Sequence, residues 1–439
     1  MPTLIIPKWT RVDSLRNRAA PERRDSRRRV YHPPIVNVIG KWGVSLGFRD
    51  FRLLWASTVL YSLATGMEQV SVGWLIFDLT GSEFMVGVGA GARMLPFFVL
   101  GILSGAIADR WDRRSLLRIG TLGASGAALL MGLLLLFGLA SVWVIIALVL
   151  ALGSAMAFTI TVRQTFTYDI VGQHHALNGL ALGAMAMQGG GIVGSLASGA
   201  MIDLLGPGWQ FIASAVCYLG SAATILAIAN PGRTLRTSSV SVLRNLVGYA
   251  QVVREHRLIL VLMVLTATTE VLGFTHMTLL PVFAKEVLHV GATGLGVMTA
   301  GRQAGGLIGL WLLAGLGATR RKGLLMFATA IGFGLGLMAF SLAGNIYTFL
   351  LVLLFTNACA HSVDTLYKTL MQDLVPDEER GRAMGSWVLS IGFAPVGHVG
   401  VGALAGAVGA PMALLINGAT LTGISVMTML GLPRIRRME

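Results

Sequence analysis

Long apolar stretches follow one another through most of this chain, and they restrict its fold more than any other feature. We count twelve of them, each near or above the length of about 20 residues that a helix needs to cross a bilayer. They lie at 52–78, 84–108, 115–138, 142–168, 176–204, 209–230, 257–284, 292–316, 323–343, 346–371, 384–407 and 410–431. The pattern predicts an all-α integral membrane protein with twelve transmembrane helices.

The composition agrees with a membrane protein and excludes several other classes. Only 12% of the residues are charged, against about 25% in soluble domains, and 54% are hydrophobic. A soluble enzyme, a disordered chain and a collagen-like repeat are therefore excluded. The cysteines Cys217 and Cys359 lie in apolar runs, so we interpret them as free buried thiols. No nucleotide-binding loop or metal-ligand motif occurs, so we expect no cofactor, no metal and no catalytic residues.

The basic residues predict the orientation of the chain. With the N-terminus in the cytoplasm, all but three of the 34 lysines and arginines fall on the cytoplasmic side. Of the exceptions, Lys285 lies outside, and Arg93 and Arg302 lie within apolar stretches. We therefore expect a multi-pass protein of the plasma membrane with both termini in the cytoplasm. The net charge of +14 then reflects topology, and no nucleic-acid partner is needed to explain it.

Polar segments divide the chain into five parts. Residues 1–51 are arginine-rich and predict a disordered basic cytoplasmic tail, with contact to anionic lipids as an alternative role. The polar segment 231–256 predicts a cytoplasmic linker between an N-terminal half, 52–230, and a C-terminal half, 257–432. Residues 433–439 form a second cytoplasmic tail. We expect no signal peptide.

An internal repeat supports two pseudo-symmetric halves of six helices each. Residues 86–93 align with 295–302, and both segments end in an arginine, Arg93 or Arg302. Residues 165–171 align with 369–375 at a similar offset. Duplicated halves are typical of secondary transporters, in which the substrate site lies between halves that rock.

The connection after the second apolar stretch carries a recognisable motif, GAIADRWDRR, at residues 105–114. It resembles the loop motif of the major facilitator superfamily, Gly-x-x-x-Asp-Arg-x-Gly-Arg-Arg, with Asp112 at the second glycine. Segments similar to the enterobactin-exporter and macrolide-efflux branch lie at 51–55, 73–82, 280–284 and 375–382. The resemblance covers about residues 48–432. It implies the major facilitator fold.

This resemblance implies a conformational latch at the motif. Asp109 is expected to face the N-terminus of the eleventh helix, where exposed N–H groups favour a carboxylate. Arg110, Arg113 and Arg114 are expected to pair with acids and lipid headgroups, and Gly105 belongs to the same motif. The alternative is that the arginines only set the topology.

Glycines spaced four apart let helices approach closely. Such pairs occur at Gly190 and Gly194 and at Gly301 and Gly305. The family fold implies that helices 2, 5, 8 and 11 lie between the halves, so we expect these glycines to pack there. General packing elsewhere is an equal alternative. In the fifth helix, Ser195 stands where exporters of this superfamily often have a proline.

Ionisable residues inside the apolar stretches are functional candidates, because a charge at the bilayer centre costs about 3 kcal/mol. They lie in helices 1, 7 and 10, which line the central cavity in the family fold. The candidates for proton coupling are Glu68, Glu270, His276, His361 and Asp364. An ion pair of Asp364 with Lys368 is one alternative, and hydrogen-bonded core histidines are another.

Other residues are candidates for the substrate cavity. These are Gln188, Asn357, Trp74 and Phe274. Arg93 and Arg302 are expected to satisfy backbone carbonyls or partner acids, with substrate contact as the alternative.

The function that these features predict is proton-coupled efflux, by antiport, of a small amphipathic compound of the drug or siderophore type. Alternating access of the two halves is the expected mechanism. The alternatives are a proton-independent facilitator or importer on the same fold and, with less support, a transport-inactive receptor. The expected partners are a small-molecule substrate, protons and the lipid bilayer, and the protein is expected to be a monomer.

Overall fold

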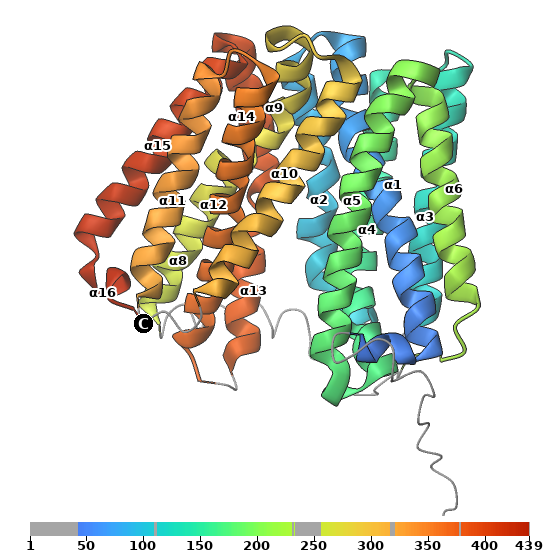
Figure 1. Ribbon diagram of the computed structural model, residues 1–439, viewed down its shortest axis with the longest axis horizontal. Helices are drawn as coiled ribbons and strands as arrows, with labels where there is room; N and C mark the ends of the chain where they lie inside the picture. Colours follow the sequence, from blue (N-terminus) through green and yellow to red (C-terminus); the bar gives the residue numbers. More distant parts are fainter. Residues whose placement is uncertain are drawn as a thin grey trace, which may run out of the picture.

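The computed structural model describes residues 43–108, 112–230, 232, 256–316, 321–376 and 379–438, and for residues 98–108 it describes the helix without the side chains. Throughout these ranges the regular structure is helical, and they contain no strand. The expected all-α class is therefore confirmed. The helices form two groups, coloured blue to green and yellow to red in Figure 1.

The first group holds six long helices joined by short turns. Gly81, Gly172 and Gly206 end three of them with a positive φ, which other residues rarely adopt. Asp112 and Ser141 begin two of them with side chains that accept backbone N–H hydrogen bonds. The helices are α1 (Arg49–Thr80), α2 (Glu83–Ala108), α3 (Arg113–Leu136), α4 (Val142–Val171), α5 (Ala176–Leu205) and α6 (Pro207–Leu226), with short turns η1 (Val44–Gly47) and η2 (Gln173–His175).

The second group repeats this order with two interrupted helices. Segment 257–287 contains two π-helical turns. It also contains Pro281, which has no backbone N–H to donate a helical hydrogen bond. Segment 380–408 is broken between Ile391 and Ala394, just before Pro395. The elements are α8 (Arg257–Thr268), η3 (Thr269–Phe274), α9 (His276–Val282), η4 (Phe283–Val287), α10 (Gly291–Gly315), α11 (Lys322–Ala339), η5 (Phe340–Leu342), α12 (Ile346–Asp373), α13 (Arg380–Ile391), α14 (Ala394–Val408), α15 (Ala410–Gly431) and α16 (Pro433–Arg436).

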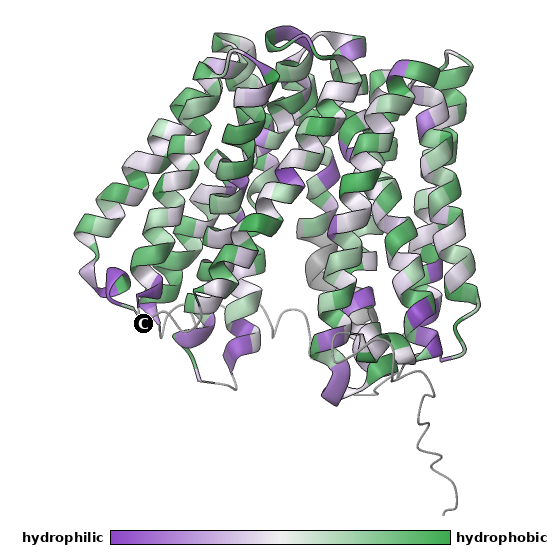
Figure 2. Cartoon of the chain, in the orientation of Figure 1, coloured by the Kyte–Doolittle hydropathy of each residue, from purple (hydrophilic) through white to green (hydrophobic). Residues whose placement is uncertain are grey.

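Nine helical segments of the described residues are long and apolar enough to cross a membrane. They are α3, α4, α5 with η2, α6, segment 257–287, α11 with η5, α12, segment 380–408 and α15. α1, α2 and α10 have 32, 26 and 25 residues but are not among the nine, so the count of twelve stays a prediction. Apolar residues cover much of the outer faces of the helices (Figure 2), as lipid contact requires.

Glycines allow close packing inside each group. α5 lies against α1, and a β-carbon at Gly190 or Gly194 would collide with α1. α10 lies against α12, where Gly305 faces backbone and Gly301 faces leucine side chains. These four glycines therefore pack within a half and not between the halves, because they lie on the faces of α5 and α10 that look inward to their own group.

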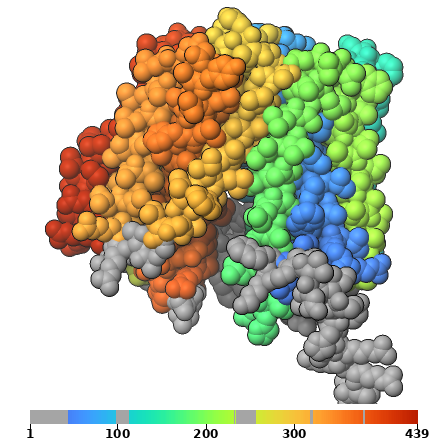
Figure 3. Space-filling view, in the orientation of Figure 1, coloured from blue at the N-terminus to red at the C-terminus, as the bar shows by residue number. Residues whose placement is uncertain are grey.

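The two groups contact each other mainly through α2 with α14 and α5 with α10. These are the second, eleventh, fifth and eighth helices in order, as the resemblance implies. Gly87 lies against Gly402, and Gly199 lies against Ala292. We call the end where α1 begins and α16 lies the terminal end, and the other end the opposite end. The contacts lie toward the opposite end, and the groups diverge toward the terminal end (Figures 1 and 3).

The helix groups lie close to the predicted halves. α1 begins at Arg49 and α6 ends at Leu226, against predicted bounds of 52 and 230, and α8 begins at Arg257 as expected. Most of the predicted tail 1–51 and linker 231–256 lies outside the described residues. The predicted tail 433–439 contains the short helix α16, in which Ile435 lies against Gly323 of α11.

Candidate functional site

A cavity of about 260 Å³ lies between the two groups of helices. Its walls come from α1, α2 and α4 on one side and from α9, α10 and α14 on the other. Apolar side chains such as Met94, Met156 and Met277 make up much of the lining. The polar residues in the lining are Gln69, Arg93, Thr278, Thr299, Arg302 and His398. A concave, mostly apolar site with a few polar groups is the usual form of a small-molecule site.

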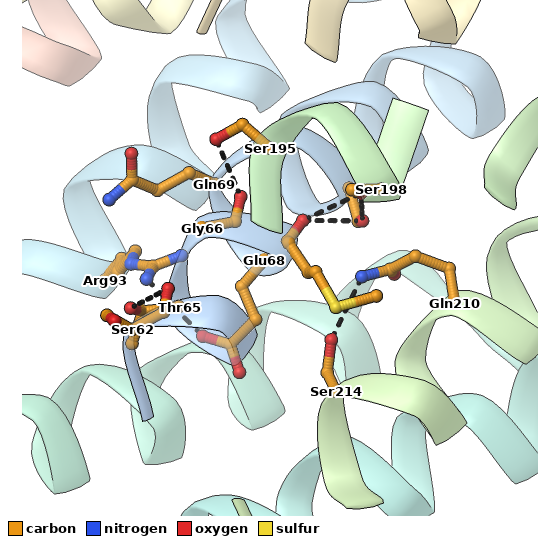
Figure 4. A network of polar contacts seen from close by, with 12 residues as sticks. Ser62, Thr65, Gly66, Glu68, Gln69, Arg93, Ser195, Ser198, Gln210 and Ser214 are labelled. Atoms are coloured by element: carbon orange, nitrogen blue, oxygen red, sulfur yellow. Dashed lines mark hydrogen bonds and ion pairs between the residues drawn. The ribbon is translucent and has the colours of Figure 1, made fainter. Parts of the chain in front are cut away.

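Arg93 reaches the cavity from α2 and forms an ion pair with Glu68 of α1. Its Nη2 lies 3.4 Å from Oε2 of Glu68, and the exposed fractions are 8% for Arg93 and 1% for Glu68. The other oxygen, Oε1, is buried and has no hydrogen-bond partner among the described residues. A buried charge needs a partner such as Arg93, because its loss of water is otherwise uncompensated. Figure 4 shows Glu68 and Arg93 converging from the two neighbouring helices.

Arg302 reaches the same cavity from α10 and bonds to the first group. Its Nη2 donates a hydrogen bond of 2.7 Å to Oε1 of Gln69. The two arginines that match in the internal repeat therefore bond to neighbouring residues of α1. Arg93 has an acidic partner, as we expect from the sequence, whereas Arg302 bonds to a neutral amide.

Two polar residues at the interface between the groups, His398 and Gln303, do not stand out in the sequence. His398 of α14 and Thr278 of α9 share a hydrogen bond of 2.6 Å in the cavity wall. Gln303 of α10 donates from Nε2 to Oγ of Ser195 on α5, at 3.1 Å. A polar residue in a glycine-rich apolar run is the one clue in the sequence to either of them.

Glu270 lies outside the cavity, in the π-helical turn η3. Among the described residues we find no hydrogen bond or ion pair to its carboxylate. Asp364 and Lys368 of α12 are the charged groups that act on it electrostatically. These two form an ion pair of 2.7 Å, and Trp387 donates to the other oxygen of Asp364 at 3.0 Å. Asp364 therefore forms the ion pair with Lys368 that the alternative interpretation of the sequence expects.

The two candidate histidines lie inside the second group and not in the cavity lining. His276 is 1% exposed, its Nδ1 lies 2.9 Å from the carbonyl oxygen of Gly273, and Asn357 lies 3.3 Å from its Nε2. His361 makes an edge contact with Phe274, with ring centroids 6.2 Å apart. The hydrogen bond of His276 fits the alternative interpretation of a hydrogen-bonded core histidine, whereas the contact described for His361 is with an aromatic ring.

Gln188 and Trp74 are also absent from the described lining of the cavity. Trp74 lies instead at the opposite end, where Lys285 sits 5.6 Å from its ring centroid. Lys285 also forms an ion pair of 2.5 Å with Asp78 at the end of α1. This pair crosses from the second group to the first.

A second contact at the opposite end joins α5 to the first turn of α10. The carboxylate of Asp203 accepts hydrogen bonds from the backbone N–H of Ala292 at 3.3 Å and of Thr293 at 2.8 Å. It also accepts one from the Thr293 hydroxyl at 2.6 Å. A carboxylate at a helix N-terminus is favoured by the unpaired N–H groups there. The opposite end therefore has a carboxylate–helix contact of the kind that the family resemblance implies for Asp109.

The predicted latch itself lies largely outside the described residues. Nothing is described of Asp109 and Arg110, and Gly105 is described only as part of α2. Arg113 forms an ion pair of 2.6 Å with Asp169 of α4. Arg114 donates to the carbonyl oxygen of Leu226 at 3.0 Å. Both bonds are internal to the first group, so the role of the motif as a latch stays a prediction.

Comparison with known proteins agrees with this architecture. The family model described as "Transmembrane secretion effector" matches residues 45–439. The chain is 22% identical over 354 residues to the staphyloferrin A transporter of Staphylococcus aureus, which covers 79% of this chain and 87% of that protein. A solved peptide transporter POT has a TM-score of 0.74 at 14% identity, covering 91% of this chain and 99% of its own.

The nucleoside transporter NupG has a TM-score of 0.73 at 15% identity, covering 87% of this chain and 99% of its own. The family and these relatives are transporters, so the prediction that the chain is not an enzyme is confirmed. The match over most of the chain establishes the family that the loop motif indicated. The chain is a multi-pass membrane transporter that belongs to the transmembrane secretion effector family of the major facilitator superfamily.

Proposed function

We propose that this chain exports a small amphipathic compound from the cytoplasm by alternating access, in exchange for protons. The observation that carries the proposal is the cavity of about 260 Å³, to which both groups of helices contribute. Rocking of the halves against each other exposes such a cavity to one side and then to the other. Its mainly apolar lining with a few polar groups fits an amphipathic solute.

We propose that the terminal end faces the cytoplasm. The support is the distribution of lysine and arginine in the sequence, which favours cytoplasmic termini in the plasma membrane. In this orientation the contacts at the opposite end, Asp203 with α10 and Asp78 with Lys285, close the outer side. The described conformation is then the one that accepts solute from the cytoplasm.

Glu270 is the best candidate for the coupling proton. Its carboxylate has no cationic side chain at ion-pair distance among the described residues, so it gains a proton without breaking an ion pair. Glu68, by contrast, is held by Arg93. Protonation changes the charge of Glu270 by one unit. If this changes the free-energy difference between the two conformations by about 1.4 kcal/mol, the ratio of their populations changes tenfold. His276, His361 and Asp364 already have hydrogen-bond, ring or ion-pair partners, so they rank below it.

The substrate class follows from the relative. The transporter of staphyloferrin A suggests a siderophore as the first compound to test, with macrolides and dyes as further members of a panel. The experiment uses purified protein in liposomes with an imposed pH gradient, a pH dye inside, and stepwise addition of each compound. Compound-triggered proton movement supports antiport.

Two variants and one control make the test specific. Glu270→Gln is expected to lower compound-triggered proton flux at least about tenfold, because an amide does not gain or lose a proton near neutral pH. Asp373→Asn is the control, since its ion pair with Lys322 lies at the surface of the terminal end. Normal flux in Glu270→Gln and loss in Glu68→Gln would move the coupling site to Glu68. Compound movement without proton flux would instead establish a facilitator.

A further inference from the structure

We propose that the cavity between the halves binds an organic anion, whose negative group is held by Arg93 and Arg302 while its apolar part packs against the methionines. This inference rests on the proposed function, because it names the chemical class of the transported solute.

The charge of the cavity lining carries the inference. Two of the described lining residues are cationic, and none of them is acidic. Arg93 is balanced by Glu68, which lies behind it and outside the lining. The one hydrogen bond that we find from Arg302 goes to the uncharged amide of Gln69. The lining therefore has an excess positive charge in surroundings of low dielectric constant, where an anion is attracted more strongly than in water.

The geometry of the donors fits a carboxylate or a similar planar anion. A guanidinium group has five N–H donors in a rigid fork that matches two oxygens at once. In both arginines the bond described uses the Nη2 atom alone, so the other donors of the fork need a different acceptor. Both side chains line the same cavity of about 260 Å³, one from each half. An anion bound to both therefore bridges the halves.

The apolar lining fits the rest of the solute. Met94, Met156 and Met277 contribute long, unbranched side chains that adapt to different shapes. Leu280 and Pro281 extend this apolar wall on the side of α9. A compound with an aromatic or aliphatic body and one acidic group matches both parts of the cavity.

Glu68 has a second role in this arrangement, as a competitor for Arg93. Its Oε2 lies 3.4 Å from Nη2 of Arg93, so its negative charge already offsets part of the positive charge that attracts an anion. An anion that binds Arg93 from the cavity therefore shares the guanidinium with Glu68. Removing the charge of Glu68 should consequently strengthen anion binding, a direction opposite to that of most binding-site substitutions.

The experiment measures equilibrium binding of tritiated 2-naphthoate and of its neutral analogue 2-naphthamide to the protein in nanodiscs. Empty nanodiscs give the background. The variants are Arg302→Gln, which keeps a donor toward Gln69, Arg302→Lys, which keeps the charge, and Glu68→Gln. Arg382→Gln is the matched control, because Arg382 lies outside the cavity at the start of α13.

The expected result is that 2-naphthoate binds at least about tenfold more tightly than 2-naphthamide, the effect of one or two charge-assisted hydrogen bonds. Arg302→Gln should remove most of this preference, Arg302→Lys should restore part of it, and Glu68→Gln should tighten 2-naphthoate severalfold. Binding of 2-naphthamide should stay the same in all variants. Equal binding of the two probes, no binding of either, or the same result for Arg302→Gln and Arg382→Gln would overturn the proposal.

Two readouts separate this inference from the proposed function. Loss of the anion preference together with continued siderophore transport in liposomes overturns the inference and leaves the transporter intact. Arginine-dependent binding of 2-naphthoate without movement of any compound supports the inference and counts against transport.

Discussion

The contact of Asp203 with the first turn of α10 leads to a prediction that tests alternating access directly. The carboxylate accepts two backbone hydrogen bonds and one hydroxyl hydrogen bond across the interface between the halves. Asp203→Ala removes all three and also the favourable charge at the helix N-terminus. Loss of such a cap costs about 1 kcal/mol, since the carboxylate is exposed and screened by water.

This energy is lost only in the conformation that has the contact. A change of about 1 kcal/mol alters a two-state ratio about fivefold. Asp203→Ala should therefore shift the population about fivefold toward the conformation in which the opposite end is open. The ion pair of Asp78 with Lys285 is exposed, so Asp78→Asn should add a shift of less than about fivefold.

The assay measures distances between two spin labels at the opposite end, attached to Leu139→Cys and Leu342→Cys after replacement of the two native cysteines by serine. Both positions are well exposed, at 68% and 86%, and belong to different halves. Double electron–electron resonance in nanodiscs gives the ratio of the populations with short and with long distances between the two labels. Asp373→Asn is the control, because it removes a carboxylate at the other end. An unchanged ratio in Asp203→Ala would refute the view that this contact holds the opposite end closed.

Further predictions concern stability, measured by thermal unfolding in detergent. Arg93→Gln should lower stability by about 3 kcal/mol, since it leaves Glu68 charged and buried, and the added change Glu68→Gln should recover much of this loss. Gly194→Ala should be strongly destabilising, because its β-carbon would collide with the backbone of Leu63. Gly123→Ala, which adds a β-carbon in open space on α3, should be neutral or stabilising. Equal effects of the two alanine substitutions would contradict the packing of α5 on α1.

The class of fold could be predicted from the sequence because a bilayer leaves few choices. An apolar stretch of membrane length must satisfy its backbone internally, so each one predicts a helix. The repeat and the loop motif then indicate the family. The sequence does not show which face of a helix packs against which neighbouring helix, and Gly190 and Gly305 are examples. Both glycines lie in interface helices, yet both pack toward their own half.

The candidate site could be predicted only in part, for a related reason. Glu68 and Arg93 each stand out as charges in apolar stretches, but only the packing of α1 on α2 makes them partners. Arg302 lies in an apolar stretch like Arg93, which predicts the same kind of partner, whereas its partner in the structure is a neutral amide. His398 and Gln303 have no motif around them, so their part in the interface follows from three-dimensional contacts alone.

α1 connects the cavity to the closed end of the transporter. Its Gln69 bonds to Arg302 in the cavity wall, and its Asp78 bonds to Lys285 at the opposite end. These residues are nine apart, which is about 14 Å along a helix. A ligand shifts a conformational equilibrium only by its difference in affinity for the two states. An anion bound as proposed to the other donors of Arg302 would contact a side chain that is itself bonded to α1. We therefore expect binding in the cavity and opening of the opposite end to be coupled through α1.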